Sequence, residues 1–368
     1  MVALPAAELT RERVQGADLL LVRSTVAVGP ALLDGSRVRF VATATIGIDH
    51  LDTAWLDGRR IRWASAPGSN ADSVAQWFAA ALLAFAARQG LTLHRRTVGV
   101  VGVGNVGSRV ARVAEALGCR VLLCDPPRAR AEGSEAFVAL DELLERSDLV
   151  TLHVPLTTLG PDPTRHLLDE GRLGRLRRGG IVINTSRGAV LATAAAAAAR
   201  RDGQLGGLIL DVFEGEPGVD PEIVAACDLA TPHIAGHSLD GKANGTLAIY
   251  QAACAFLGRK PAWQPRRSLP PPPLRHLSLD ARSLDDQAAA LTVIRRYYAI
   301  EQDDAALREL LRLPVAERGP AFARYRNQYP IRRELTGLRL QMVPPRPRAL
   351  ALLRALGVQT LDPSQFPG

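Results

Sequence analysis

Residues 97–110 read TVGVVGVGNVGSRV, and this stretch predicts the fold of the chain. A β-type apolar run leads into glycines in the spacing GxGxxG, and a helical pattern over 106–117 follows. This arrangement is typical of dinucleotide binding, because a backbone without Cβ atoms lets a pyrophosphate approach the helix N-terminus. The cofactor contacts predicted in this turn are Gly102, Gly104, Asn105, Val106 and Gly107.

The next predicted strand, 120–125, ends on Asp125, 18 residues after Gly107. A carboxylate at this position accepts hydrogen bonds from the ribose hydroxyls and repels a 2′-phosphate. The sequence therefore predicts NAD rather than NADP as the cofactor. Arg128 lies three residues beyond Asp125 and would act in the opposite direction, because a guanidinium attracts a phosphate.

Short apolar runs recur along the chain and alternate with helical patterns, so we predict an α/β fold with a parallel sheet of about six strands. Long helices are predicted over 72–88 and 240–257. The further predicted strands are 17–23, 38–45, 149–154, 180–184, 206–212 and 228–231.

Four segments are expected along the chain. The proline run 270–273 favours an extended polyproline spacer, which places a linker between two folded parts. The expected division is a substrate domain over 1–72 with a returning helix 237–258, a Rossmann-type NAD domain over 73–236, a linker over 259–273 and a small α+β domain over 274–368.

Composition excludes several other classes of protein. With 368 residues, 47% hydrophobic and 22% charged, the chain is long enough for several folding units and has the composition of a globular protein. The formal charge of +8 comes from arginines spread over the whole length, so we expect no nucleic-acid partner. The longest apolar run, 77–87, is roughly half of the ~20 residues that a membrane helix needs.

The cysteine pattern and the N-terminus indicate where the protein works. The four cysteines lack CxxC spacing, which argues against a metal site and a disulfide framework. No basic patch followed by an apolar segment is visible at the start of the chain. We therefore expect a cytoplasmic protein that binds neither a metal nor a membrane.

Polar motifs follow three of the predicted strands: NTSRG at 184–188, DVFEGEP at 211–217 and TPHIAG at 231–236. Open α/β sheets bind ligands at the carboxyl ends of their strands, so these motifs are expected to lie together. Arg187 can hold a carboxylate in a two-pronged grip. His233 can remove a hydroxyl proton, and a hydrogen bond from its ring to Glu216 would fix the tautomer and stabilise the imidazolium.

By these motifs the chain resembles the D-isomer-specific 2-hydroxyacid dehydrogenases. Longer stretches are similar to the branch of that family that oxidises 4-phospho-D-erythronate in vitamin B6 biosynthesis, and the resemblance covers nearly the whole chain. These stretches are ATATIGIDHLD at 42–52, CDPPRA at 124–129, HIAGHSLDGKA at 233–243 and YPIRRE at 329–334.

The resemblance implies specific roles for residues of this chain. The implied catalytic set is Arg187, Glu216 and His233. The implied NAD contacts beyond the glycine turn are Asp125, Val154, Thr185, Ser186, Asp211 and Gly236. The implied substrate contacts are Ser24, Thr45 and His237, the last where the family usually has a tyrosine. Arg23 and the pair Arg332 and Arg333 are candidates for binding the substrate phosphate.

The resemblance also implies a phosphorylated 2-hydroxy acid as substrate, a flavodoxin-like substrate domain whose first strand is missing here, and a homodimer formed through the C-terminal domain. Two alternatives stay open. One is another D-2-hydroxyacid dehydrogenase, of the 3-phosphoglycerate or glyoxylate type. The other is a non-catalytic protein that senses NAD, although such a protein would tolerate loss of the arginine, glutamate and histidine present here.

Overall fold

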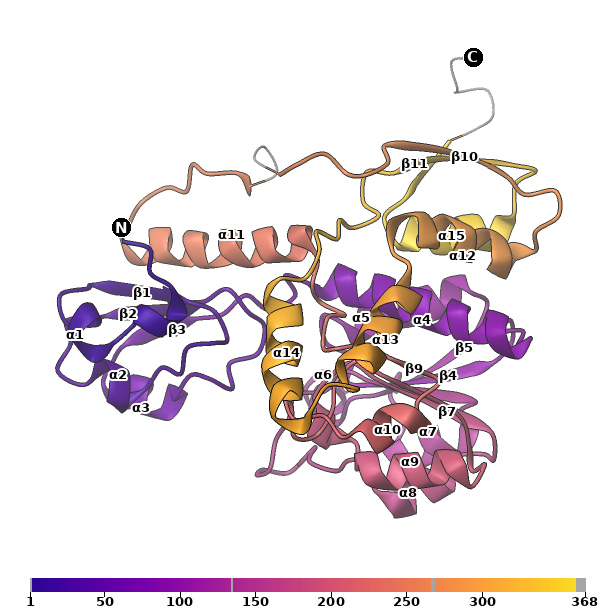
Figure 1. The fold of residues 1–368 in the computed structure, drawn as a ribbon, viewed down its shortest axis with the longest axis horizontal. Helices are drawn as coiled ribbons and strands as arrows, with labels where there is room; N and C mark the ends of the chain where they lie inside the picture. The colour runs from indigo at the N-terminus through magenta and orange to yellow at the C-terminus, as the bar shows by residue number, and fades with distance from the viewer. Residues whose placement is uncertain (1, 134, 266–268, 362–368) are drawn as a thin grey trace. The chain divides into compact units, whose positions relative to one another are not determined.

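The computed structural model describes residues 2–133, 135–265 and 269–361. It divides the chain into two compact units, one formed by residues 1–70 with 238–271 and the other by 71–237 with 272–368. Each unit contains parallel strands covered by helices, so the predicted α/β class is confirmed (Figure 1). Within the described ranges, no helix combines the length and the apolar character that crossing a bilayer requires.

The first unit is built on a parallel sheet in the order β1-β2-β3. The strands are β1 (Leu19–Val22), β2 (Phe40–Thr43) and β3 (Arg62–Ala64). All four residues of β2 are buried, because helix α11 (Leu239–Phe256) covers one face and three short helices cover the other. The short helices are α1 (Arg11–Val14), α2 (Pro30–Leu33) and α3 (Thr53–Gly58). Residues from the start and the end of this unit therefore share one core.

The second unit contains a six-stranded parallel sheet in the order β5-β4-β6-β7-β8-β9, as the sequence predicts. The strands are β4 (Thr97–Val101), β5 (Arg120–Cys124), β6 (Leu149–Leu152), β7 (Gly180–Asn184), β8 (Leu205–Leu210) and β9 (Leu229–Ala230). The central strands β6 and β7 are buried along their whole length, because helices cover both faces of the sheet.

Helices α4 (Ala71–Gln89) and α5 (Gly107–Ala116) pack on one face of this sheet. The other face is covered by α7 (Leu140–Arg146), α8 (Glu170–Arg175), α9 (Thr193–Arg201) and α10 (Pro221–Ala226). A short helix α6 (Pro126–Glu132) follows β5. The chain runs from β4 to β5 on one side and then to β6 on the other, so the strand order reverses at β4. Ligands of open α/β sheets bind at such a reversal, beyond the carboxyl ends of the strands.

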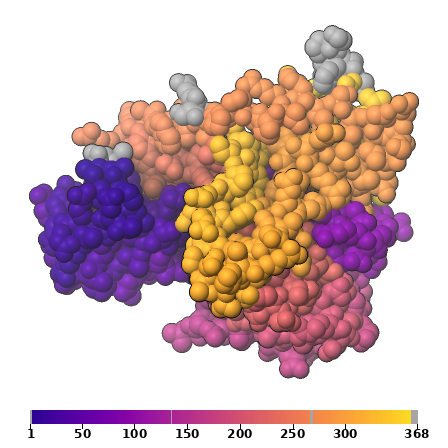
Figure 2. Space-filling view, in the orientation of Figure 1, coloured from indigo at the N-terminus to yellow at the C-terminus, as the bar shows by residue number. Residues whose placement is uncertain are grey.

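The C-terminal segment packs within this same second unit. Its parallel strands are β10 (His276–Asp280), β11 (Arg339–Val343) and β12 (Gln359–Thr360), and its helices are α12 (Asp286–Tyr297), α13 (Ile300–Leu310), α14 (Val315–Asn327) and α15 (Pro347–Ala355). The space-filling view shows α14 directly on the surface that carries α10 (Figure 2). The division into three domains expected from the sequence stays a prediction.

Candidate active site

The glycine turn lies where β4 ends and α5 begins. A Cβ on Gly102 would lie 2.7 Å from the carbonyl oxygen of His153, and a Cβ on Gly107 would overlap the carbonyl of Gly102. The inner side of the turn is therefore packed backbone against backbone. At the exposed Gly104, a Cβ would meet nothing within 4 Å. This open outer side, next to the first N–H groups of a helix, fits a pyrophosphate.

Asp125 closes the turn from the end of β5. Its Oδ2 accepts a hydrogen bond from the N–H of Val103 at 2.8 Å, and its Oδ1 accepts from the N–H of Arg128 at 3.1 Å. The Arg128 guanidinium donates to both carboxylate oxygens of Glu132, at 2.7 and 2.9 Å, and to the carbonyl of Val103 at 2.6 Å. The charge of Arg128 is thus paired with Glu132, and the Asp125 carboxylate is held beside the turn.

His153, which the sequence did not single out, lies at the end of β6. Its Nε2 is 2.9 Å from the hydroxyl of Thr151, and its Nδ1 is 3.2 Å from the hydroxyl of Thr185. Burial lowers the pKa of His153 to about 3, so the ring is neutral at physiological pH. It connects the ends of β6 and β7 and orients Thr185. A polar residue directly after the apolar run 149–152 was the available sequence signal.

Val154 follows His153 and lies against the glycine turn. Its Cγ1 would be 2.7 Å from a Cβ built on Gly102. Gly102 directly follows β4 and Val154 follows β6 by two residues, and these two strands pair with each other at the reversal of strand order. The structure therefore brings the predicted contacts Gly102 and Val154 together.

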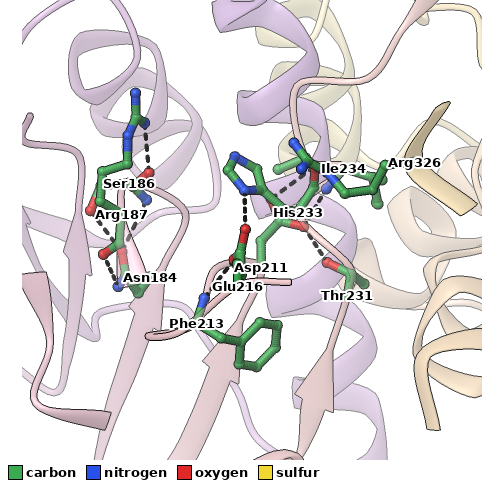
Figure 3. Close-up of polar contacts among 11 residues, drawn as sticks. Asn184, Ser186, Arg187, Asp211, Phe213, Glu216, Thr231, His233, Ile234 and Arg326 are labelled. Carbon is green, nitrogen blue, oxygen red and sulfur yellow. Dashed lines mark hydrogen bonds and ion pairs between the residues drawn. The ribbon is translucent and has the colours of Figure 1, made fainter. Parts of the chain in front are cut away.

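The turn after β7 is organised by the buried side chain of Asn184. The Asn184 Oδ1 accepts from the N–H of Ser186 at 2.9 Å and from its hydroxyl at 2.7 Å, and the Asn184 amide donates to the carbonyl of Arg187 at 2.9 Å. One amide thus defines the turn that presents Thr185, Ser186 and Arg187. The Arg187 guanidinium donates to the Ser186 carbonyl at 2.9 Å (Figure 3).

Glu216 and His233 meet beyond the ends of β8 and β9. The His233 Nδ1 lies 2.7 Å from the Glu216 Oε2, and the Glu216 Oε1 accepts from the N–H of Phe213 at 2.8 Å (Figure 3). The side chain of His233 is 32% exposed and that of Glu216 is 18% exposed, so the pair is accessible to a ligand without being fully solvated. With Nδ1 occupied by the carboxylate, Nε2 is the nitrogen left for chemistry.

Asp211 lies beneath the loop that carries His233. Its Oδ1 accepts from the Thr231 hydroxyl at 2.6 Å and from the N–H of Ile234 at 2.8 Å, and its Oδ2 accepts from the N–H of Ala235 at 2.9 Å. Burial raises the pKa of Asp211 to about 6, against the opposing effect of the His233 charge and of these hydrogen bonds. In the structure, this predicted cofactor contact braces the histidine loop.

The predicted catalytic residues therefore come from the ends of three adjacent strands, β7, β8 and β9. Glu216 and His233 are in direct contact, and Arg187 belongs to the neighbouring turn. Gly236 and His237 continue the same loop, where the His237 ring packs edge-on against Tyr329 at 5.9 Å between centroids. The parallel sheet thus brings together motifs that are distant in the sequence, as expected for motifs that follow adjacent strands.

Two predicted substrate contacts lie in the first unit. Ser24 and Thr45 each follow a strand by two residues, and those strands pair through Val22 and Thr43. The Thr45 hydroxyl donates to the carbonyl of Gly47 at 2.9 Å, and Ser24 is exposed. Within this unit, both residues therefore lie at the same edge of the sheet.

Comparison with known proteins defines the class. Residues 71–235 match the model for the NAD binding domain of D-isomer specific 2-hydroxyacid dehydrogenase, and residues 268–357 match a domain of unknown function, DUF3410. D-lactate dehydrogenase from Aquifex aeolicus, solved with NAD and lactic acid, is similar with a TM-score of 0.58 and 27% identity, over 68% of this chain and 86% of that chain. The chain is an NAD-binding dehydrogenase of the D-isomer specific 2-hydroxyacid class, as predicted.

Two curated relatives share most of this chain, and both are called erythronate-4-phosphate dehydrogenase. The one from Salinibacter ruber is 48% identical over 340 residues, which is 90% of this chain and 86% of that protein. The one from Pseudomonas syringae pv. syringae is 47% identical over 357 residues, 96% of this chain and 93% of that protein. The chain belongs to the erythronate-4-phosphate dehydrogenase family.

Proposed function

We propose that this chain oxidises 4-phospho-D-erythronate to 3-hydroxy-2-oxo-4-phosphooxybutanoate with NAD, as a step in pyridoxal 5′-phosphate biosynthesis. The observation that carries the proposal is the hydrogen bond of 2.7 Å between His233 and Glu216, beyond the strand ends of an NAD-binding sheet. The names of relatives that are 48% and 47% identical point to this substrate.

His233 is the base of the proposed reaction. Its Nδ1 donates to the Glu216 carboxylate, so Nε2 presents a lone pair and removes the proton from the C2 hydroxyl. The Glu216 carboxylate then stabilises the imidazolium that forms. Glu216 is itself held by the N–H of Phe213, so it does not have to reorganise during proton transfer.

Arg187 orients the substrate in this proposal. A planar guanidinium holds the C1 carboxylate in a two-pronged grip and polarises the C2 oxygen as the carbonyl forms. The turn organised by Asn184 restricts where the backbone of Arg187 can lie. Ser24, Thr45 and His237 are proposed to contact the substrate. Imidazole is shorter than the phenol of the family tyrosine, so His237 is expected to act through a water molecule.

The cofactor residues bind and orient NAD, which when bound accepts the hydride from C2. The glycine turn 102–107 binds the pyrophosphate, and Asp125 accepts from the ribose hydroxyls. The remaining proposed contacts are Val154, Thr185, Ser186, Asp211 and Gly236. We also propose that the enzyme is a cytoplasmic homodimer in which residues 274–368 form the dimerisation domain and 1–72 the substrate domain.

The test measures NADH formation by the full chain with 4-phosphoerythronate, 3-phosphoglycerate and a glyoxylate-type hydroxy acid at matched concentrations. We expect the highest kcat/KM for 4-phosphoerythronate, and a value about 1,000-fold lower for the His233→Ala variant. A preference for another acid would show that the proposed substrate is wrong and that the proposed reaction, oxidation of a 2-hydroxy acid with NAD, is right. Tight NADH binding without turnover of any acid would favour a sensor of NAD and overturn the proposal.

A further inference from the structure

A buried carboxylate in the C-terminal segment is surrounded by tyrosines. Asp303, on α13, is 5% exposed and accepts hydrogen bonds from three hydroxyls: Tyr298 at 2.9 Å, Tyr325 at 2.7 Å and Tyr329 at 2.7 Å. Burial raises the pKa of each of these tyrosines above its ordinary value, so the hydroxyls stay protonated and donate. We call these four residues the tyrosine cluster.

Arg332 connects the tyrosine cluster to the loop of His233. Its side chain is buried, and its guanidinium lies 4.4 Å from the centre of the Tyr298 ring. Its Nη2 donates to the carbonyl oxygen of Ala235 at 2.5 Å. The Nε of Arg326, on α14, donates to the carbonyl of His233 at 3.3 Å (Figure 3). Two arginines of the C-terminal segment therefore bind the backbone of the loop that carries the proposed base.

The residues that follow Arg332 bind α4. Glu334 accepts from the Ser73 hydroxyl at 2.7 Å, and the side chain of Gln76 accepts from the N–H of Leu335 at 3.2 Å. The other end of the Gln76 amide donates to the carbonyl of Leu356 at 3.1 Å. Arg332 is thus held both by its side chain and through the residues that follow it.

The His233 loop needs these hydrogen bonds, because His233 has a φ of +56°. This is a left-handed backbone conformation that residues other than glycine rarely adopt. A conformation of this kind persists only where its surroundings determine it. Asp211 binds the N–H groups of Ile234 and Ala235 from one side. The two arginines donate hydrogen bonds to the carbonyls of His233 and Ala235. The loop backbone is therefore held through its N–H groups on one side and through its carbonyl groups on the other.

We propose that Arg332, held by the tyrosine cluster, is a positioning residue that keeps the His233 loop in its reactive conformation, with Arg326 as a second support. This inference rests on the proposed function and assigns a role in catalysis to part of the segment that matches the domain of unknown function. In this role Arg332 does not bind the substrate phosphate, which is the alternative role named for it in the sequence analysis.

The experiment compares Arg332→Met, Arg332→Lys and Tyr329→Phe in the full chain with Arg324→Met, which changes an exposed arginine of α14. We expect Arg332→Met to lower kcat with 4-phosphoerythronate about 10- to 100-fold, since small displacements of a reactive group are costly. KM for the substrate and NADH binding should change little. Arg332→Lys, which keeps a cationic donor, should recover part of kcat, Tyr329→Phe should cause a smaller loss, and Arg324→Met none.

A second readout does not need turnover. The protein has seven histidines, and the imidazole signal lost in His233→Ala identifies His233 in NMR spectra. Arg332→Met and Tyr329→Phe should move that signal, while Arg324→Met should not.

If the wild-type chain is inactive on 4-phosphoerythronate but the signal moves, the substrate is wrong and the positioning role stands. A raised KM with unchanged kcat and an unmoved signal would identify Arg332 as a substrate ligand and overturn the inference. If Arg332→Met does not fold, Tyr329→Phe and Arg326→Met decide by the same two measurements.

Discussion

The Nδ1 of His233 lies 2.7 Å from the Oε2 of Glu216, although 17 residues separate them in the chain. The contact forms because β8 and β9 are adjacent and parallel, so the turns that follow them emerge at the same edge of the sheet. The hydrogen bond sets the tautomer of the imidazole and directs Nε2 away from the carboxylate. This geometry is the one that the proposed base requires.

Glu216→Gln should lower kcat about 100-fold, because the amide keeps a hydrogen bond to Nδ1 but no longer stabilises the imidazolium. His233→Ala should cost more, about 1,000-fold, while NADH affinity stays close to that of the wild type. Steady-state kinetics and NADH fluorescence titration measure the two effects. Glu222→Gln changes an exposed glutamate on α10 and serves as the control. Equal activity of Glu216→Gln and wild type would remove the carboxylate from the mechanism.

Arg187→Lys should impair substrate use without impairing cofactor binding. An ammonium cannot form the two parallel hydrogen bonds that a guanidinium makes with a carboxylate, so we expect kcat/KM for the acid to fall about 100-fold. The KM for NAD should stay within about twofold, because a loss of uniform cofactor binding is not expected. Arg201→Lys, at an exposed position near the end of α9, is the matched control. A change confined to the KM for NAD would contradict the assignment.

Asp125→Ser should weaken NAD binding about tenfold, because a charge-assisted hydrogen bond is worth about 1.5–3 kcal/mol and serine keeps only part of it. Use of NADP should improve relative to NAD, since the repulsion of a 2′-phosphate is gone. Adding Glu132→Gln should enlarge this shift, because Arg128 then loses the carboxylate that now neutralises it. Ratios of kcat/KM for the two cofactors provide the measurement, and an unchanged ratio in the double variant would contradict the prediction.

His153 should make the folded state sensitive to acid. Its pKa is about 3 in the folded protein and about 6.5 in an unfolded chain, so below pH 6.5 the unfolded state binds a proton that the folded state does not. Stability should therefore fall as the pH drops from about 6.5 towards 3, by at most about 1.4 kcal/mol per pH unit from this group. Urea unfolding of wild type and His153→Gln at pH 7 and pH 5 isolates the effect, because other groups titrate in both proteins. Parallel losses of stability in the two proteins would show that His153 does not contribute.

Local patterns predicted the nucleotide-binding half of the molecule well. The glycine spacing, the apolar runs of buried parallel strands and Asp125 are short-range signals, and each corresponds to an element or contact in the structure. The C-terminal segment was predicted less completely. Strand β10 is five residues long and none of them is buried, and α14 contains Pro320, so neither has the strong apolar signal of a core element. His153 was missed because a single histidine after a strand has no motif around it.

The sequence by itself determined the class of fold and the cofactor, and it named the residues proposed for the site, because each depends on residue types at short spacing. The Glu216–His233 hydrogen bond was expected from the sequence, and the tertiary structure supplied its geometry. Only the tertiary structure showed that Asp211 binds the backbone of the histidine loop, and that Arg332 binds it as well from a segment almost 100 residues further along the chain. Such contacts depend on strand order and on packing between distant helices. No local pattern of residues encodes them, because they form only when the whole core is buried.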